Sequence, residues 1–202
     1  MKDIFTGFLG SILAGICIAL GATAYLVTGQ AILFPIGLFI IVFYKLFLFT
    51  GQVPYLSKLS DIPKLLIMVV GNVIGAYLMG VTVRFCKPDL VNKAIDLCSV
   101  KLLEGWKLIP LAILCNVMIF IAVDACKYAR VSELEKIVCL WLATTVFVVC
   151  GFEHCIANTF YFGLSGMMGT NAISFLLLNI LWNAVGGIVI RNLFRLSIGE
   201  CE

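Results

Sequence analysis

Glu153 and His154 are the residues of this chain whose types and spacing could do chemistry. They are adjacent inside an otherwise apolar run, and His154 is the only histidine among the 202 residues. A charged group at the centre of a bilayer costs roughly 2.5–3.5 kcal/mol on insertion scales, so such a pair marks a functional site. Gly151 before the pair and Asn158 after it indicate that a helix breaks there. A broken helix turns an apolar span into a polar site at membrane depth, as in transporters and channels.

The composition assigns the chain to a lipid bilayer. Its residues are 62% hydrophobic and 12% charged, with a mean hydropathy of +1.13, which is too apolar for a water-soluble surface. The net charge of +3 comes without a basic cluster interleaved with aromatics, so no nucleic-acid partner is expected. Nine cysteines form neither a CxxC pair nor a metal-ligand spacing and are interpreted as small apolar residues. We expect one transmembrane channel domain, residues 1–202, without a cleavable signal peptide, metal or cofactor.

Six apolar stretches are candidate membrane spans. They cover about Ile4–Val27, Ala31–Thr50, Ile62–Phe85, Leu108–Val123, Ile137–Phe162 and Ala172–Ile190. The second is expected to end in a break at Thr50–Gly51, the fourth is barely long enough to cross, and the fifth is interrupted at the Glu-His pair. Six spans place both termini on one side, whose loops carry eight Lys or Arg against five on the other. The positive-inside rule therefore predicts that both termini are cytoplasmic.

A weak internal repeat relates the two halves of the chain. Gly71–Ala76 in the third span reads G-N-V-I-G-A, and Trp182–Gly187 in the sixth reads W-N-A-V-G-G. Two sets of three spans must have opposite orientations, so the halves would form an inverted repeat with broken second and fifth helices. For the individual residues we favour the interpretation that these N-x-x-G pairs pack helices closely.

These motifs resemble those of the formate/nitrite transporter family. The run from Gly151 to Asn158 reads G-F-E-H-C-I-A-N and resembles the family signature G-F-E-H-S-[IV]-A-N, with Cys155 where Ser is usual. Leu48–Gly51 resembles the L-F-T-[GS] loop of the second helix, and Asn116 matches an Asn of the fourth. The resemblance implies an all-α, aquaporin-like fold in the cell membrane and a homopentamer with one anion pore through each protomer.

The resemblance also implies roles for individual residues. His154 corresponds to the central pore histidine, and Thr50 faces it from the broken second helix. Further pore residues and apolar constrictions are implied at Asn116, Asn158 and Lys101, at Phe34 and Leu38 on the cytoplasmic side, at Phe147 on the extracellular side, and at Phe49. Glu153 is expected to be structural, bonding the broken segments rather than titrating in the pore.

The implied arrangement is physically consistent. A small charged anion cannot cross an apolar constriction cheaply, because desolvation is costly, and protonation removes most of that cost. An imidazole can supply hydrogen bonds or a proton near neutral pH, and Lys101 on the outer face would attract anions. The expected function is a channel or transporter for a small weak-acid anion such as formate, nitrite or hydrosulfide. A lactate, acetate or neutral-solute channel of the same fold remains the alternative.

The chain also departs from the family pattern outside this signature. Only about three residues precede the first span, where the family usually carries an amphipathic segment. Lys45 is a cation within a span, seven residues after Leu38 and on the same helix face. It is either an anion attractor or a lysine that snorkels or pairs with a Glu.

Other function classes fit the sequence less well. A water or glycerol channel of this kind would carry two Asn-Pro-Ala elements, and the chain has no Asn-Pro. An ammonium channel would need a second pore histidine, and a membrane metalloenzyme would need several ligands. We therefore expect a transport protein and not an enzyme.

Overall fold

The computed structural model describes residues 2–128 and 131–198, and this part of the chain is helical throughout apart from its connections. The α-helices are α1 (Lys2–Thr28), α2 (Ile36–Phe43), α3 (Phe49–Gln52), α4 (Ile62–Cys86), α5 (Val91–Leu102), α6 (Leu108–Tyr128), α7 (Glu133–Val149), α8 (Cys155–Ser165) and α9 (Thr170–Ile198). Short 3-10 helices lie between them: η1 (Ala31–Leu33), η2 (Val53–Tyr55), η3 (Leu59–Asp61), η4 (Pro88–Leu90) and η5 (Gly105–Lys107).

Four helices of the described chain are long and apolar enough to cross a membrane: α1, α4, α6 and α9. Their apolar spans run for 24, 28, 23 and 28 residues, and about 20 helical residues cover the hydrocarbon core. The sequence predicts all four. The fourth span is longer than expected, because α6 continues beyond Val123 to Tyr128.

The second and fifth spans are broken helices, as the sequence predicts. In the first break α2 ends at Phe43, Lys45 adopts a left-handed backbone with φ of 55°, and α3 begins at Phe49. The break therefore lies before Thr50–Gly51, the position expected from sequence, because Thr50 and Gly51 are inside α3.

The second break has the same backbone course. Here α7 ends at Val149, Gly151 has a φ of 66°, and α8 begins at Cys155. In both breaks the left-handed residue lies four positions before the half-helix, and the residue just before that helix is extended. The two breaks are structural equivalents, which confirms the inverted repeat.

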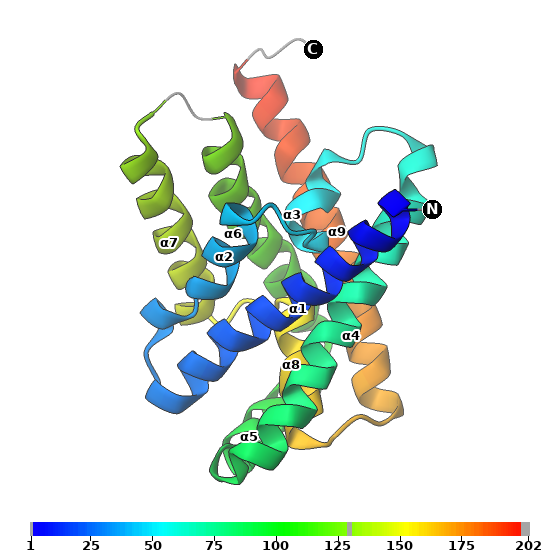
Figure 1. Ribbon diagram of the computed structural model, residues 1–202, viewed down its shortest axis with the longest axis vertical. Coiled ribbons are helices and arrows are strands. Elements are labelled where there is room, and N and C mark those ends of the chain that lie inside the picture. Colours follow the sequence, from blue (N-terminus) through cyan, green and yellow to red (C-terminus); the bar gives the residue numbers. More distant parts are fainter. Residues whose placement is uncertain (1, 129–130, 199–202) are drawn as a thin grey trace.

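The half-helices tie the two halves of the chain together. Helix α8, from the second half, packs along α4 and α1 of the first half, while α3 and η2 pack against α6 and α9 of the second (Figure 1). We call the side where α7 begins and α9 ends the terminal side, and the side where α4 ends the α5 side; they are at the top and bottom of Figure 1.

The polar connection between the third and fourth spans contains a helix that the sequence does not predict. Helix α5 buries Ala94, Cys98 and Lys101 and packs against α8. Burial of every third or fourth residue is typical of a helix lying on the protein surface. Because Lys93, Asp96 and Lys101 are charged, the sequence of this segment reads as a polar connection.

Candidate functional site

Thr50 and His154 meet near the centre of the molecule, and each is supplied by one of the two breaks. Thr50 is the second residue of α3, and His154 immediately precedes α8. The Thr50 hydroxyl oxygen lies 3.0 Å from Nε2 of His154, and both side chains are buried. The fold therefore brings together two residues that are 104 positions apart in the chain.

The neighbours of His154 fix which of its ring nitrogens carries a proton. Nδ1 accepts a 3.2 Å hydrogen bond from the backbone N–H of Ala157, which makes the imidazole the N-cap of α8. A nitrogen that accepts carries no proton, so the neutral ring donates from Nε2 to the Thr50 hydroxyl. Protonating Nδ1 would break the cap and place a cation against the positive end of the α8 dipole. The pair therefore presents the Thr50 hydroxyl as a hydrogen-bond donor rather than a fixed charge.

Asn72 of α4 fastens the first break. Its side-chain oxygen accepts a 2.8 Å hydrogen bond from the backbone N–H of Phe49, the first residue of α3. Its amide nitrogen donates to the carbonyl oxygens of Phe47, in the break, and Ser11, in α1. One buried side chain thus satisfies backbone groups that the broken helix leaves unpaired in an apolar setting.

Asn183 of α9 fastens the second break in the same way. It accepts a 2.9 Å hydrogen bond from the backbone N–H of Cys155 and donates to the carbonyl oxygens of Glu153 and Ala112. The N-x-x-G repeat marked both asparagines in the sequence. Its interpretation as helix packing is right for the glycines but wrong for Asn72 and Asn183, because repeat spacing alone does not reveal hydrogen bonds to a distant break.

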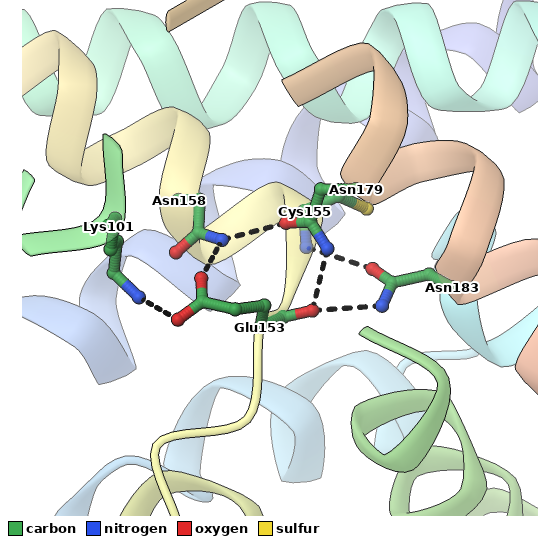
Figure 2. A network of polar contacts seen from close by, with 6 residues as sticks. All are labelled: Lys101, Glu153, Cys155, Asn158, Asn179 and Asn183. Carbon is green, nitrogen blue, oxygen red and sulfur yellow. Dashed lines mark hydrogen bonds and ion pairs between the residues drawn. The ribbon is translucent and has the colours of Figure 1, made fainter. Parts of the chain in front are cut away.

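Glu153 is the centre of a buried polar network (Figure 2). Its carboxylate forms an ion pair with Lys101 and accepts a 2.6 Å hydrogen bond from Asn158. Asn158 also donates to Asn179 at 2.7 Å, and Asn179 donates to the Glu153 carbonyl oxygen at 2.8 Å. The Glu153 carboxylate thus bonds α5 and α8, and its backbone carbonyl oxygen bonds α9. The network joins α5, α8, α9 and the second break.

Glu104, in the connection between α5 and α6, adds a second carboxylate to this region. Its Oε2 atom is buried and has no hydrogen-bond partner within the described residues. Burial, followed by the negative charge of Glu153, raises the pKa of Glu104 to about 8. Lys101 and Lys107 oppose this rise only in part. Glu104 is therefore protonated at neutral pH, which leaves Lys101 to pair with Glu153 alone.

A cavity of about 80 Å³ opens on the α5 side of the Thr50–His154 pair. Its lining includes Lys101, Gly151, His154 and Asn158, together with aromatic side chains. Since Lys101 is paired with Glu153, the fixed charge next to this cavity is largely compensated. We call this space the α5-side cavity.

A larger cavity of about 530 Å³ opens on the terminal side. Leu38, Leu48 and Gly51 are among its lining residues, and Gly51 directly follows Thr50 in α3. Lys45 and Lys127 also line it. We call this space the terminal-side cavity. The Thr50–His154 pair lies between the two cavities.

The resemblance places Phe34 and Leu38 on the same, cytoplasmic side. In the structure the two residues line different cavities. Its ring packs edge-on against Phe147, with the ring centroids 5.3 Å apart, and both residues line the α5-side cavity. Phe147 in turn stacks on the His154 ring at 5.7 Å. Phe34 directly follows η1 and precedes α2. Leu38 lies one helical turn later, within α2, and lines the other cavity. Phe34 and Phe147 therefore lie on the α5 side of the Thr50–His154 pair, and Leu38 lies on its terminal side.

Asn116 and Phe49 are buried, but neither is among the described residues that line the two cavities. The Asn116 amide fits beside Pro54 and against Gly187, where any side chain on the glycine would collide with it. Neither polar atom of the Asn116 side chain has a hydrogen-bond partner within the described residues. Phe49 begins α3 and uses its backbone N–H to bond Asn72.

Comparison with known proteins identifies the fold. The family model described as Formate/nitrite transporter matches residues 2–196. A solved pentameric formate channel with formate bound superposes with a TM-score of 0.77 at 23% identity, covering 96% of this chain and 94% of that one. An ion channel of the same family gives a TM-score of 0.82 at 20% identity, covering 98% and 91%. At these identities the structural likeness establishes the fold.

The relatives that are named as formate channels are longer than this chain. The formate channel FocA of Haemophilus influenzae is 25% identical over 188 residues, covering 79% of this chain and 66% of the relative. The formate channel BtFdhC of Bacillus thuringiensis is 29% identical over 148 residues, covering 66% and 56%. The chain thus spans less than two thirds of the length of these relatives. The family match and the shared fold nevertheless agree: the chain is a multi-pass integral membrane protein that belongs to the formate/nitrite transporter family, a family of transport proteins and not of enzymes.

Proposed function

We propose that the protein is a channel for small monovalent anions of weak acids, with formate the first candidate. The path runs from the α5-side cavity past Phe34 and Phe147, across the Thr50–His154 pair, and past Leu38 into the terminal-side cavity. The observation that carries the proposal is the hydrogen bond between Thr50 and His154. It lies between the two cavities, at the point where both half-helices begin.

The geometry suits an anion of low charge. His154 donates to the Thr50 oxygen, so the Thr50 hydroxyl hydrogen is free to point to a carboxylate or nitrite oxygen in the path. Apolar side chains on both sides exclude hydrated ions. An anion that accepts these bonds, or that crosses as its neutral acid, avoids the desolvation cost that blocks other ions.

Assembly and orientation complete the proposal. One solved relative is a pentamer, and we propose the same homopentamer here, with a path through each protomer. We also propose that the terminal side faces the cytoplasm, in line with the excess of Lys and Arg on that side. Lys101 would then lie towards the outside, where its network with Glu153 holds Asn158 at the cavity wall.

Flux through proteoliposomes of the purified protein tests the function. Formate, nitrite, hydrosulfide, lactate and glycerol are compared at two pH values. We expect selective passage of one small acid, faster at the lower pH, because protonation removes the desolvation cost. Passage of lactate at the rate of formate would favour the wider-channel alternative, and passage of glycerol alone would refute the anion channel.

Substitution of the central pair tests the mechanism. Asn is a good N-cap, so His154→Asn keeps an acceptor for Ala157 but loses the donor to Thr50. Hydrogen bonds to charged groups are worth about 1.5–3 kcal/mol, so we expect formate flux to fall by about tenfold or more. Thr50→Val should fall similarly. Thr144→Val is the matched control, since among the described residues the buried Thr144 hydroxyl donates to the Leu140 carbonyl oxygen of its own helix. Wild-type flux in His154→Asn and Thr50→Val would rule out the pair.

A further inference from the structure

The terminal-side cavity contains an unexplained feature of the backbone. Lys45 is the only residue other than glycine with positive φ in the described chain, at 55°. A left-handed backbone disfavours any side chain with a Cβ, and such residues gather at functional sites. The equivalent position of the second break is Gly151, which adopts the same conformation freely. The first break therefore carries a lysine where its structural equivalent has the unstrained residue.

The two breaks also differ in charge at a second position. Phe47 and Glu153 are equivalent: each lies two residues before its half-helix, and each carbonyl accepts from the asparagine that fastens its break. The second break thus places a carboxylate close to its cavity, and the first does not. Together with Lys45, this difference makes the terminal-side cavity more positive than its equivalent.

The positive charges of this cavity are only partly balanced, because among the described residues Asp124 interacts with Lys127 without forming an ion pair with it. Its described lining contains Lys45 and Lys127 and no acidic residue. Neither lysine forms an ion pair within residues 2–128 and 131–198. The Lys127 ammonium lies 4.2 Å from the centroid of the Tyr55 ring, which holds it in place without cancelling its charge. Asp124, the acidic residue on the same helix, accepts a 2.8 Å hydrogen bond from the Tyr55 hydroxyl.

We propose that Lys45, Lys127 and Gln52 form a binding site for a small monocarboxylate in the terminal-side cavity. The two ammonium groups attract the carboxylate, and the Gln52 amide supplies a neutral donor from the fourth residue of α3, the position that Asn158 has in α8. The remaining walls are mostly aliphatic, including Leu38 and Val123, and suit a short alkyl group. The site rests on the proposed anion-channel function and makes it more specific, since it concentrates carboxylate next to Thr50.

Equilibrium exchange of isotopically labelled formate in proteoliposomes tests the site. Equal formate on both sides makes the result independent of protein orientation, and the concentration dependence gives the half-saturating concentration. Lys45→Asn and Lys45→Gly both remove the charge, and both residues tolerate the left-handed backbone. We expect the half-saturating concentration to rise about two- to fivefold, the effect of one solvent-accessible charge. Lys45→Arg should match the wild type.

Two controls separate carboxylate binding at Lys45 from a general effect of surface charge and from backbone strain. Lys58→Asn removes an exposed lysine that does not line the cavity and should leave saturation unchanged. If Lys45 were only a strained residue, Lys45→Gly would saturate as the wild type does while melting at a higher temperature. Unchanged saturation in both Lys45→Asn and Lys45→Gly would overturn the site.

A binding measurement keeps this test separate from the proposed channel function. Broadening of the ¹³C resonance of formate by the detergent-solubilised protein reports binding without transport. We expect broadening that is reduced in Lys45→Asn and retained in Lys45→Arg and Lys58→Asn. If the wild type carried no formate yet broadened its signal through Lys45, the channel would fail and the site would stand. Equal broadening by the wild type and Lys45→Asn would overturn the site, whatever the flux.

Discussion

The two breaks of this protein share one backbone solution and differ in their chemistry. Each has an extended residue before a half-helix and a left-handed residue four positions before it. Asn72 and Asn183 make corresponding hydrogen bonds to the two breaks. The shared part is what an apolar environment demands, because a broken helix in a membrane must satisfy its exposed backbone groups.

The differences lie in the side chains that face the cavities. At three equivalent positions the residues are Lys45 against Gly151, Phe47 against Glu153, and Leu48 against His154. The second break therefore supplies the histidine and the carboxylate, while the first supplies Thr50 and Lys45, which has no ion pair among the described residues. An inverted repeat fixes the positions available for chemistry, and the asymmetry between its halves gives the two sides of the path different charges.

Among the described residues, the one buried ion pair joins the second break to α5, and it should give the largest difference between the breaks. Lys101→Met leaves the Glu153 carboxylate buried without its cation. Such a change costs about 3–5 kcal/mol, or about 6–20 °C in melting temperature for a chain of this size. Thermal unfolding in detergent measures it.

The double variant Lys101→Met with Glu153→Gln provides the control for this prediction. It removes both charges and should recover most of the lost stability, because no uncompensated charge remains. Phe47→Leu, at the equivalent position of the first break, should melt within a few degrees of the wild type. A Lys101→Met protein as stable as the wild type would show that Glu153 does not depend on this cation.

The asparagines test how far the two breaks are equivalent. Asn72→Ala leaves the Phe49 N–H and the Phe47 carbonyl unpaired, at a cost of about 1–3 kcal/mol for each group. Asn183→Ala should cost less, because Asn179 still donates to the Glu153 carbonyl. Thermal unfolding of both variants gives the order. A larger loss for Asn183→Ala would mean that Asn179 does not substitute for it.

The sequence predicts most of the fold, because apolar length and helix breaks follow directly from composition. The four long spans and the interruption at Gly151 are of this kind. The position of the first break was less predictable: Lys45 is an unusual left-handed residue, whereas glycine at Gly51 was the expected one. The sequence does not predict the amphipathic helix α5, because its buried face includes the charged Lys101. That face can be recognised only once its partner α8 is known.

The candidate site was only partly readable from sequence. Thr50 and His154 were identified through motif resemblance, and no periodicity relates residues so distant in the chain. The partners of Glu153 come from three other helices, so its network required the tertiary structure. Glu104 gave no signal at all, because an acidic residue in a polar connection is ordinary until its burial is known.

Glu104 belongs to the connection that has no equivalent in the first half, and it should give the smallest effect. Its pKa in the folded protein, about 8, lies above the ordinary value of 4.5. Between these values the folded state binds more protons than the unfolded state, so Glu104 makes stability fall as pH rises and has no further effect above about pH 8. Glu104→Gln removes this dependence.

The melting temperature of the wild type relative to that of Glu104→Gln should therefore decline by a few degrees from pH 5 to pH 9. Glu133→Gln, which changes an exposed carboxylate on the terminal side, is the control and should follow the wild type. A wild type that gains stability relative to Glu104→Gln over this range would show that Glu104 is ionised beside Glu153.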